Sequence, residues 1–134
     1  MKLLDFVKAA RVPKSIKPQE YLDWEIRREK KTSEFTSSQP LLMQRLGPFK
    51  DWTILSKNSM ATLHLLHGDV VMEDSEAELK THWPIWRDAK GKVLITGLGL
   101  GCVVRGLLAN PEVTHIGILL RRQTVIKTSV CAWR

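Results

Sequence analysis

The stretch "VLITGLGLGCVVRGLLANPEVTHIGILL", residues 93–120, constrains the fold of this chain more than any other. A short apolar run is followed by glycines that alternate with leucines, and then by "CVVRGLLAN", which favours a helix that Asn110-Pro111 stops. A second apolar run, residues 113–120, comes next. Strand, glycine turn, helix and strand in this order predict a βαβ unit with parallel strands and a right-handed crossover.

The glycines at positions 97, 99 and 101 allow two interpretations. A tight turn between a strand and a helix needs backbone angles that only glycine adopts readily. Alternatively, a backbone without β-carbons lets a ligand approach closely, and the amide groups at the start of the next helix point toward that ligand. The pattern alone leaves both interpretations open.

Residues 1–90 predict a different kind of structure. Residues 3–10 are a helix candidate that ends before Val12-Pro13, and residues 18–31 carry apolar side chains on a helical period after Pro18. In residues 51–74, β-favouring runs are broken by turn-forming residues, which predicts a small antiparallel meander. Asp74 or Ser75 is expected to cap a helix over residues 76–86, which Pro84 interrupts or bends.

These patterns define the expected fold class and domains. We expect an α/β chain with N-terminal helices and antiparallel β-hairpins in residues 1–90, and the opening βαβ of a larger sheet in residues 91–134. No apolar run reaches the length of about 18 residues that a membrane span needs, so a cytoplasmic protein without membrane contact is expected. Cys102 and Cys131 lack metal-ligand spacing, which predicts free thiols and no metal site.

The net charge of +7 lies mainly in the first half of the chain. Residues 1–67 hold twelve basic and seven acidic side chains, against nine and seven in residues 68–134. The runs "KAARVPKSIKP" and "EIRREKK" could contact phosphates, although Glu25, Glu29 and Glu34 suit helical ion pairs and favour a solvated helix face for the second run. A non-catalytic interaction or nucleic-acid-binding module is therefore the alternative function.

The glycine stretch resembles the first motif of class I S-adenosylmethionine-dependent methyltransferases. The preceding "GDVVMEDSEAELKTHWPIW" is similar to the lead-in of the spermidine-synthase-like branch. A dinucleotide fingerprint would place a glycine at Cys102, so the resemblance favours S-adenosylmethionine over NAD as cofactor. It implies a Rossmann-like sheet, methyl or aminopropyl transfer, and a cofactor-binding loop formed by Gly97, Leu98, Gly99, Leu100 and Gly101.

The chain also departs from that family. The family's second strand ends in an acidic residue that holds the ribose, whereas this chain has Gly117, Ile118, Leu119 and Leu120 there. The later strands that carry the catalytic groups are not present, so the chain is expected to be incomplete, either truncated or frame-altered, and inactive alone. Two parallel strands with uncovered edges and apolar runs further predict a homo-oligomer.

No catalytic residue can be assigned from the sequence. Glu78 and His82 match part of the aminopropyltransferase pattern, but Glu76 and Ala77 replace its tyrosine and first histidine. A helix-surface carboxylate and a packed or solvated imidazole are therefore the favoured interpretations. Cys102 has no visible base beside it, which favours a small packed residue over a nucleophile. The five tryptophans are expected in the core and at interfaces.

Overall fold

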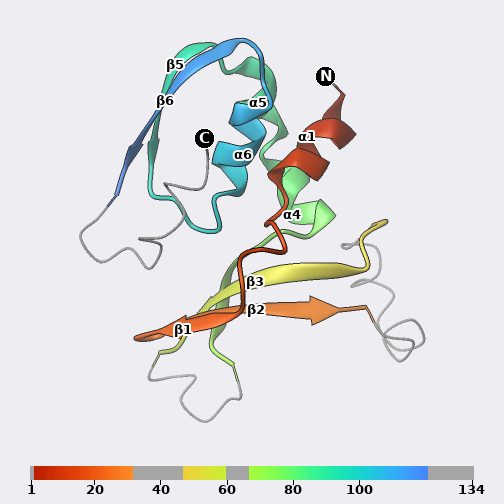
Figure 1. The fold of residues 1–134 in the computed structure, drawn as a ribbon, viewed down its shortest axis with the longest axis vertical. Coiled ribbons are helices and arrows are strands. Elements are labelled where there is room, and N and C mark those ends of the chain that lie inside the picture. Colours follow the sequence, from red (N-terminus) through yellow and green to blue (C-terminus); the bar gives the residue numbers. More distant parts are fainter. Residues whose placement is uncertain (1, 32–46, 60–66, 121–134) are drawn as a thin grey trace.

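The structure, a computed structural model, describes residues 2–31, 47–59 and 67–120. An antiparallel sheet forms the lower layer in Figure 1, and the helices lie above it together with a separate two-stranded parallel sheet. Helix α1 (Leu3–Ala10) lies beside the later helices, so the start of the chain packs against its second half. The molecule is therefore a mixed α/β structure, as the sequence predicts.

The antiparallel sheet has the strand order β1-β2-β3-β4. Its strands are β1 (Gln19–Tyr21), β2 (Trp24–Lys30), β3 (Asp51–Lys57) and β4 (Asp69–Glu73). The register of β3 on β4 shifts between Leu55 and Ser56, where a bulge places one extra residue in β4. The predicted antiparallel arrangement of residues 51–74 is confirmed for β3 and β4, while residues 60–66 lie outside the described part.

The prediction of a helix over residues 18–31 is wrong, because this segment forms the hairpin of β1 and β2. Side chains of β2 alternate between the two faces of the sheet: Ile26 is buried in the core, and Arg27 on the other face donates to Ser56 Oγ at 3.0 Å. The charges that suit helical ion pairs are instead strand neighbours two residues apart. Arg27 Nε lies 3.2 Å from Glu29 Oε1, and Arg27 Nη1 lies 3.8 Å from Glu25 Oε2. Pairing with β3 overrides the helical spacing.

The predicted helix after β4 is confirmed, with a break at the proline. It consists of α4 (Glu76–Thr81) and α5 (Trp83–Asp88), and Pro84 occupies the first turn of α5, where its missing amide hydrogen does no harm. Ser75 is the cap residue of α4, since its hydroxyl accepts from the Glu78 amide at 3.4 Å. The Ser75 cap leaves the Asp74 side chain available for other contacts.

The glycine stretch forms β5 (Gly91–Thr96), α6 (Cys102–Leu108) and β6 (Val113–Leu119). The two strands pair in parallel, with Val93 opposite Ile116 and Thr96 opposite Leu119, so both predicted strands and the helix between them are confirmed. Burial alternates along β5, and Leu94 is 73% exposed on the outer face. One face of this small sheet is therefore packed against the protein, and no described element covers the other.

One core joins the two halves of the chain. Phe6 and Val7 from α1 pack with Leu79, Trp86 and Leu107, so both of the predicted segments, 1–90 and 91–134, contribute to it. A β-carbon on Gly106 would lie 2.2 Å from the Trp86 ring, which shows how closely α6 approaches α5. The domain boundary at residue 91 stays a prediction. Of the helices described, none is long and apolar enough to cross a membrane.

Candidate ligand-binding loop

The loop between β5 and α6 requires glycine at three positions. Gly97, Gly99 and Gly101 have φ angles of +79°, +54° and +76°, in the left-handed region that other residues adopt only with strain. Gly101 is also the N-cap residue of α6. The turn interpretation of the glycines therefore holds at all three positions, and a role in ligand binding would come in addition to it.

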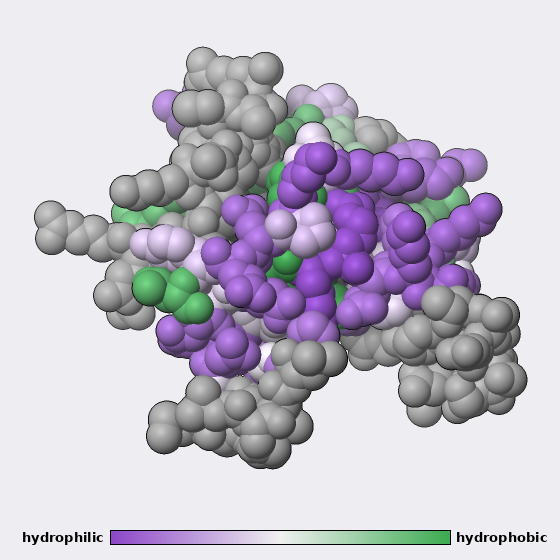
Figure 2. Space-filling model, turned by 60° about the horizontal axis from the view of Figure 1, so that its bottom comes forward, coloured by the Kyte–Doolittle hydropathy of each residue, from purple (hydrophilic) through white to green (hydrophobic). Residues whose placement is uncertain are grey.

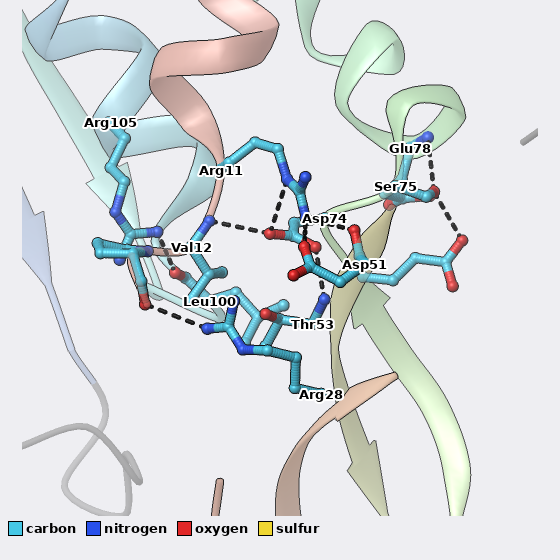
Figure 3. Close-up of polar contacts among 12 residues, drawn as sticks. Arg11, Val12, Arg28, Asp51, Thr53, Asp74, Ser75, Glu78, Leu100 and Arg105 are labelled. Carbon is cyan, nitrogen blue, oxygen red and sulfur yellow. Dashed lines mark hydrogen bonds and ion pairs between the residues drawn. The ribbon is translucent and has the colours of Figure 1, made fainter. Parts of the chain in front are cut away.

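The two leucines hold the loop in place. Leu98 and Leu100 are 8% and 3% exposed, so their side chains are buried on the protein side. The Leu100 carbonyl also accepts from the buried Arg105 guanidinium at 2.8 Å (Figure 3). The alternation of glycine and leucine thus produces a loop whose side chains anchor it while its glycines fit tight backbone turns.

Gly97 and Gly99 have very different surroundings. A β-carbon on Gly97 would meet none of the described residues within 4 Å, whereas one on Gly99 would lie 2.8 Å from the sulfur of Met72 in β4. That sulfur accepts from the Leu100 amide at 3.3 Å. At Gly99 the backbone is therefore approached by a side chain of the protein itself, and open space for a ligand exists at Gly97.

The amide groups of the loop are only partly used within the protein. Gly97 donates to the Leu119 carbonyl at 2.8 Å, and Gly101 donates to the Leu98 carbonyl at 2.7 Å. Among the residues described, the amides of Leu98 and Gly99 have no acceptor. These two donors are the loop groups that an added acceptor could satisfy.

The end of β6 lies next to this loop. Leu119 pairs with Thr96 and is 63% exposed, and its carbonyl accepts from Gly97. The structure thus brings together the loop and the end of β6, where the sequence comparison expected a carboxylate and the chain has Leu119. An exposed leucine at that position supplies no acceptor side chain.

The next candidates from the sequence are Cys102 and Glu78. Cys102 is fully buried, and burial, with a smaller contribution from nearby Asp74, raises the pKa of its thiol to about 12. The thiol therefore stays protonated at neutral pH and is a poor nucleophile, in agreement with the interpretation of Cys102 as a packed residue. Glu78 lies partly buried on α4.

His82 is a packed imidazole at the end of α4. Its ring lies edge-on to Trp86 with 5.7 Å between centroids, and burial lowers its pKa although Glu78 acts in the opposite direction. Its Nε2 atom is buried without a hydrogen-bond partner in the described part of the chain. These surroundings fit the packed interpretation of the histidine.

The structure also reveals a buried polar cluster around Asp74 that the sequence patterns did not indicate (Figure 3). Its carboxylate is fully buried and accepts from the amides of Thr53 at 2.6 Å and Val12 at 2.9 Å, and from Arg11 Nε at 3.3 Å. Arg11 also reaches Asp51 Oδ1 at 3.1 Å. The cluster ties the segment after α1 to β3 and fixes the end of β4, two residues beyond Met72.

The described residues include no group of three or more histidine, cysteine, aspartate or glutamate side chains that could hold a metal ion. Comparisons with protein-family models, curated proteins and solved structures returned no match for this chain. The class that the structure defines is a mixed α/β protein in which a glycine loop connects two parallel strands through a helix.

Proposed function

We propose that this chain is an S-adenosylmethionine-binding, methyltransferase-like protein in which β5, α6 and β6 are the opening βαβ of a Rossmann-like sheet. The observation that carries the proposal is the loop of residues 97–101. It follows a parallel strand, it has open space at Gly97, and two of its amides lack an acceptor among the described residues. Such a backbone can receive the polar groups of a nucleotide-like ligand.

The proposed binding is weak. A carboxylate that holds a ribose forms charge-assisted hydrogen bonds worth about 1.5 to 3 kcal/mol each, and the exposed Leu119 beside the loop offers none. The loop amides then remain as the main polar contacts. We expect a dissociation constant above about 10 µM for S-adenosylmethionine.

Methyl or aminopropyl transfer by this chain alone is not part of the proposal. Transfer needs an acceptor held in line with the sulfonium carbon, and no described residue beside the loop offers a general base in a suitable place. Cys102 is buried with a raised pKa, and His82 is packed against Trp86. A radiolabelled methyl-transfer assay with nucleic acid, protein and small amines should show no turnover above background.

A pair of matched variants tests the binding site. Gly91 and Gly97 both have positive φ, at +62° and +79°, and a β-carbon on either would lie more than 4 Å from every residue that the structure describes. They lie at opposite ends of β5, and only Gly97 belongs to the loop. Asparagine tolerates the left-handed region best among the other residues, so Gly91→Asn and Gly97→Asn should destabilise the fold by similar small amounts.

Calorimetric titration with S-adenosylmethionine, its demethylated product and NAD then separates the outcomes. We expect Gly97→Asn to abolish adenosyl binding while Gly91→Asn leaves it unchanged. Equal effects of the two variants, or stronger binding of NAD, would contradict the proposal. An affinity tighter than about 10 µM would show that the missing carboxylate is replaced by another group.

Self-association and a cytoplasmic location accompany this proposal. Leu94 and Leu119 are exposed on the outer face of the parallel sheet, and within the described part neither edge of that sheet pairs with another strand. A second copy of the chain could cover these groups. Light scattering should show a dimer or larger species that Leu94→Lys weakens, and a compact monomer at all concentrations would contradict this.

A cytoplasmic location fits the proposed ligand and the cysteine chemistry. Adenosylmethionine is an intracellular metabolite, and a buried free thiol such as Cys102 fits a reducing compartment.

A further inference from the structure

A row of aromatic and basic side chains crosses one end of the antiparallel sheet, away from the glycine loop in sequence. The register places Tyr21 opposite Trp24, Trp24 opposite Lys57, and Lys57 opposite Asp69. Residues directly opposite one another in adjacent antiparallel strands point to the same face. These four side chains therefore form one row across the sheet, at the end where β1 turns into β2 (Figure 1).

The row combines exposed aromatic surface with positive charge. Tyr21 is 56% exposed, while Trp24 is partly buried against the core. The Lys57 ammonium lies over the Trp24 ring, 5.1 Å from its centroid, and the Lys57 side chain is exposed. One aromatic ring is thus available for stacking, and a cation is held beside it.

The two faces of this sheet differ in how their cations are compensated. On the face opposite the row, Arg27 pairs with both Glu25 and Glu29. On the face of the row, Arg28 donates to the carbonyls of Pro13 and Ile16, which adds no negative charge. Arg27 is therefore compensated by carboxylates, whereas Arg28 forms no ion pair with a carboxylate among the described residues.

Two further cations lie in the segment of residues 13–17, whose Pro13 and Ile16 carbonyls accept hydrogen bonds from Arg28. Lys14 and Lys17 are exposed, and neither forms an ion pair with any described residue. Together with Arg28 and Lys57 they outnumber the nearby carboxylates of Asp23 and Asp69. Figure 2 turns forward the side of the antiparallel sheet that faces away from the helices, and this side is mostly hydrophilic with separate hydrophobic areas.

We infer that this row, defined by Tyr21, Trp24 and Lys57, is a binding surface for single-stranded nucleic acid that continues along the same face of β2 to Arg28, four positions from Trp24, and to the segment of Lys14 and Lys17 that Arg28 contacts. Unpaired bases stack on exposed aromatic rings, and phosphates are neutralised by nearby lysines and arginines. An acidic protein segment would use the charges but not the exposed ring. This surface shares no residue with the proposed adenosyl site, so either can fail without the other.

The test uses the full chain and fluorescence anisotropy with a fluorescein-labelled dodecamer of thymidylate and another of uridylate. We expect binding that weakens about tenfold in Tyr21→Ala, and that is retained in Tyr21→Phe because the ring is kept. Tyr21 is exposed, so neither variant should unfold the protein. Gly97→Asn should leave oligonucleotide binding unchanged.

Salt dependence measures the basic part of the surface. A plot of the logarithm of the association constant against the logarithm of the salt concentration should have a negative slope. The slope should be no steeper than about −3 if all four cations contact phosphates. Lys57→Gln should reduce that slope by about 0.7. Lys90→Gln, which removes an exposed lysine between α5 and β5, is the matched control and should leave the slope unchanged.

Several outcomes would overturn the inference. The first is no binding at about 100 µM protein. The second is equal binding by Tyr21→Ala and the unaltered chain, and the third is an equal effect of Lys57→Gln and Lys90→Gln on the salt dependence. Competition by polyglutamate as effective as competition by the unlabelled oligonucleotide would assign the surface to acidic partners in general. Tighter binding of a duplex of the same sequence would also contradict a single-strand site.

Discussion

The sulfur of Met72 accepts a hydrogen bond from the Leu100 amide at 3.3 Å and lies against Gly99, so a side chain of the antiparallel sheet contacts the backbone of the glycine loop. Thioether sulfur is a weak acceptor but packs well against irregular surfaces. The contact explains why position 99 needs a glycine beyond its φ angle. It also links β4, which Asp74 fixes, to the loop proposed to bind adenosylmethionine.

Replacing Met72 by leucine should remove the hydrogen-bond acceptor of the Leu100 amide with little change in the free energy of unfolding. Leucine has a similar volume, so the free energy of unfolding should fall by less than about 1.5 kcal/mol. Loss of the acceptor should speed hydrogen exchange at Leu100 by up to about tenfold. The Gly101 amide, bonded to the Leu98 carbonyl, is the internal control. Unchanged exchange at Leu100 would show that the sulfur is not its acceptor.

Alanine at Gly99 should destabilise the fold more than alanine at Gly97. Gly97→Ala meets only the strain of its left-handed backbone, about 1 kcal/mol, since its β-carbon faces open space. Gly99→Ala carries the same strain and must also displace the Met72 sulfur. Urea unfolding measures both values. In a double-mutant cycle Met72→Ala should relieve part of the Gly99→Ala effect, and strict additivity would argue against the contact.

Removing the Asp74 carboxylate should be among the most destabilising single changes in the described core. Asp74→Ala leaves the buried amides of Val12 and Thr53 without their acceptor and removes the partner of Arg11 Nε, although Arg11 keeps Asp51; the change should cost about 3 to 5 kcal/mol. Asp88→Ala is the matched control, because it also breaks a pair with an arginine but is 62% exposed. Its effect on the free energy of unfolding, measured by heat or urea, should be close to zero because solvent screens an exposed pair. Similar losses for both variants would contradict a structural role for the cluster.

His82 should make stability fall as the pH falls. Burial lowers its pKa below the ordinary value of 6.5, so the folded state binds a proton less readily than the unfolded state. The resulting stability is fully present above pH 6.5 and is lost as the pH falls below it toward the folded pKa. His82→Phe removes the titrating group and keeps a ring beside Trp86. Urea unfolding at pH 7.5 and 5.5 should differ less in this variant, and an unchanged difference would exclude His82 as a source of the pH dependence.

The sequence by itself determined the parts of the fold in which local signals agree. Strand, glycine turn and helix in residues 91–110 were predictable because apolar runs, left-handed glycines and the Asn110-Pro111 stop all act over a few residues. The helix over residues 3–10 and the break at Pro84 follow from equally local rules. The glycine loop was recognised as a candidate site for the same reason.

Only the tertiary structure decided the features that depend on distant partners. Residues 19–30 carry apolar side chains that fit either a helix or a strand, and pairing of β2 with β3 selects the strand. That choice creates the row of Tyr21, Trp24 and Lys57, which no helix could present. Met72 against Gly99, and Asp74 with Arg11, join residues separated by 27 and 63 positions. Such contacts arise from packing and burial, which local sequence patterns do not encode.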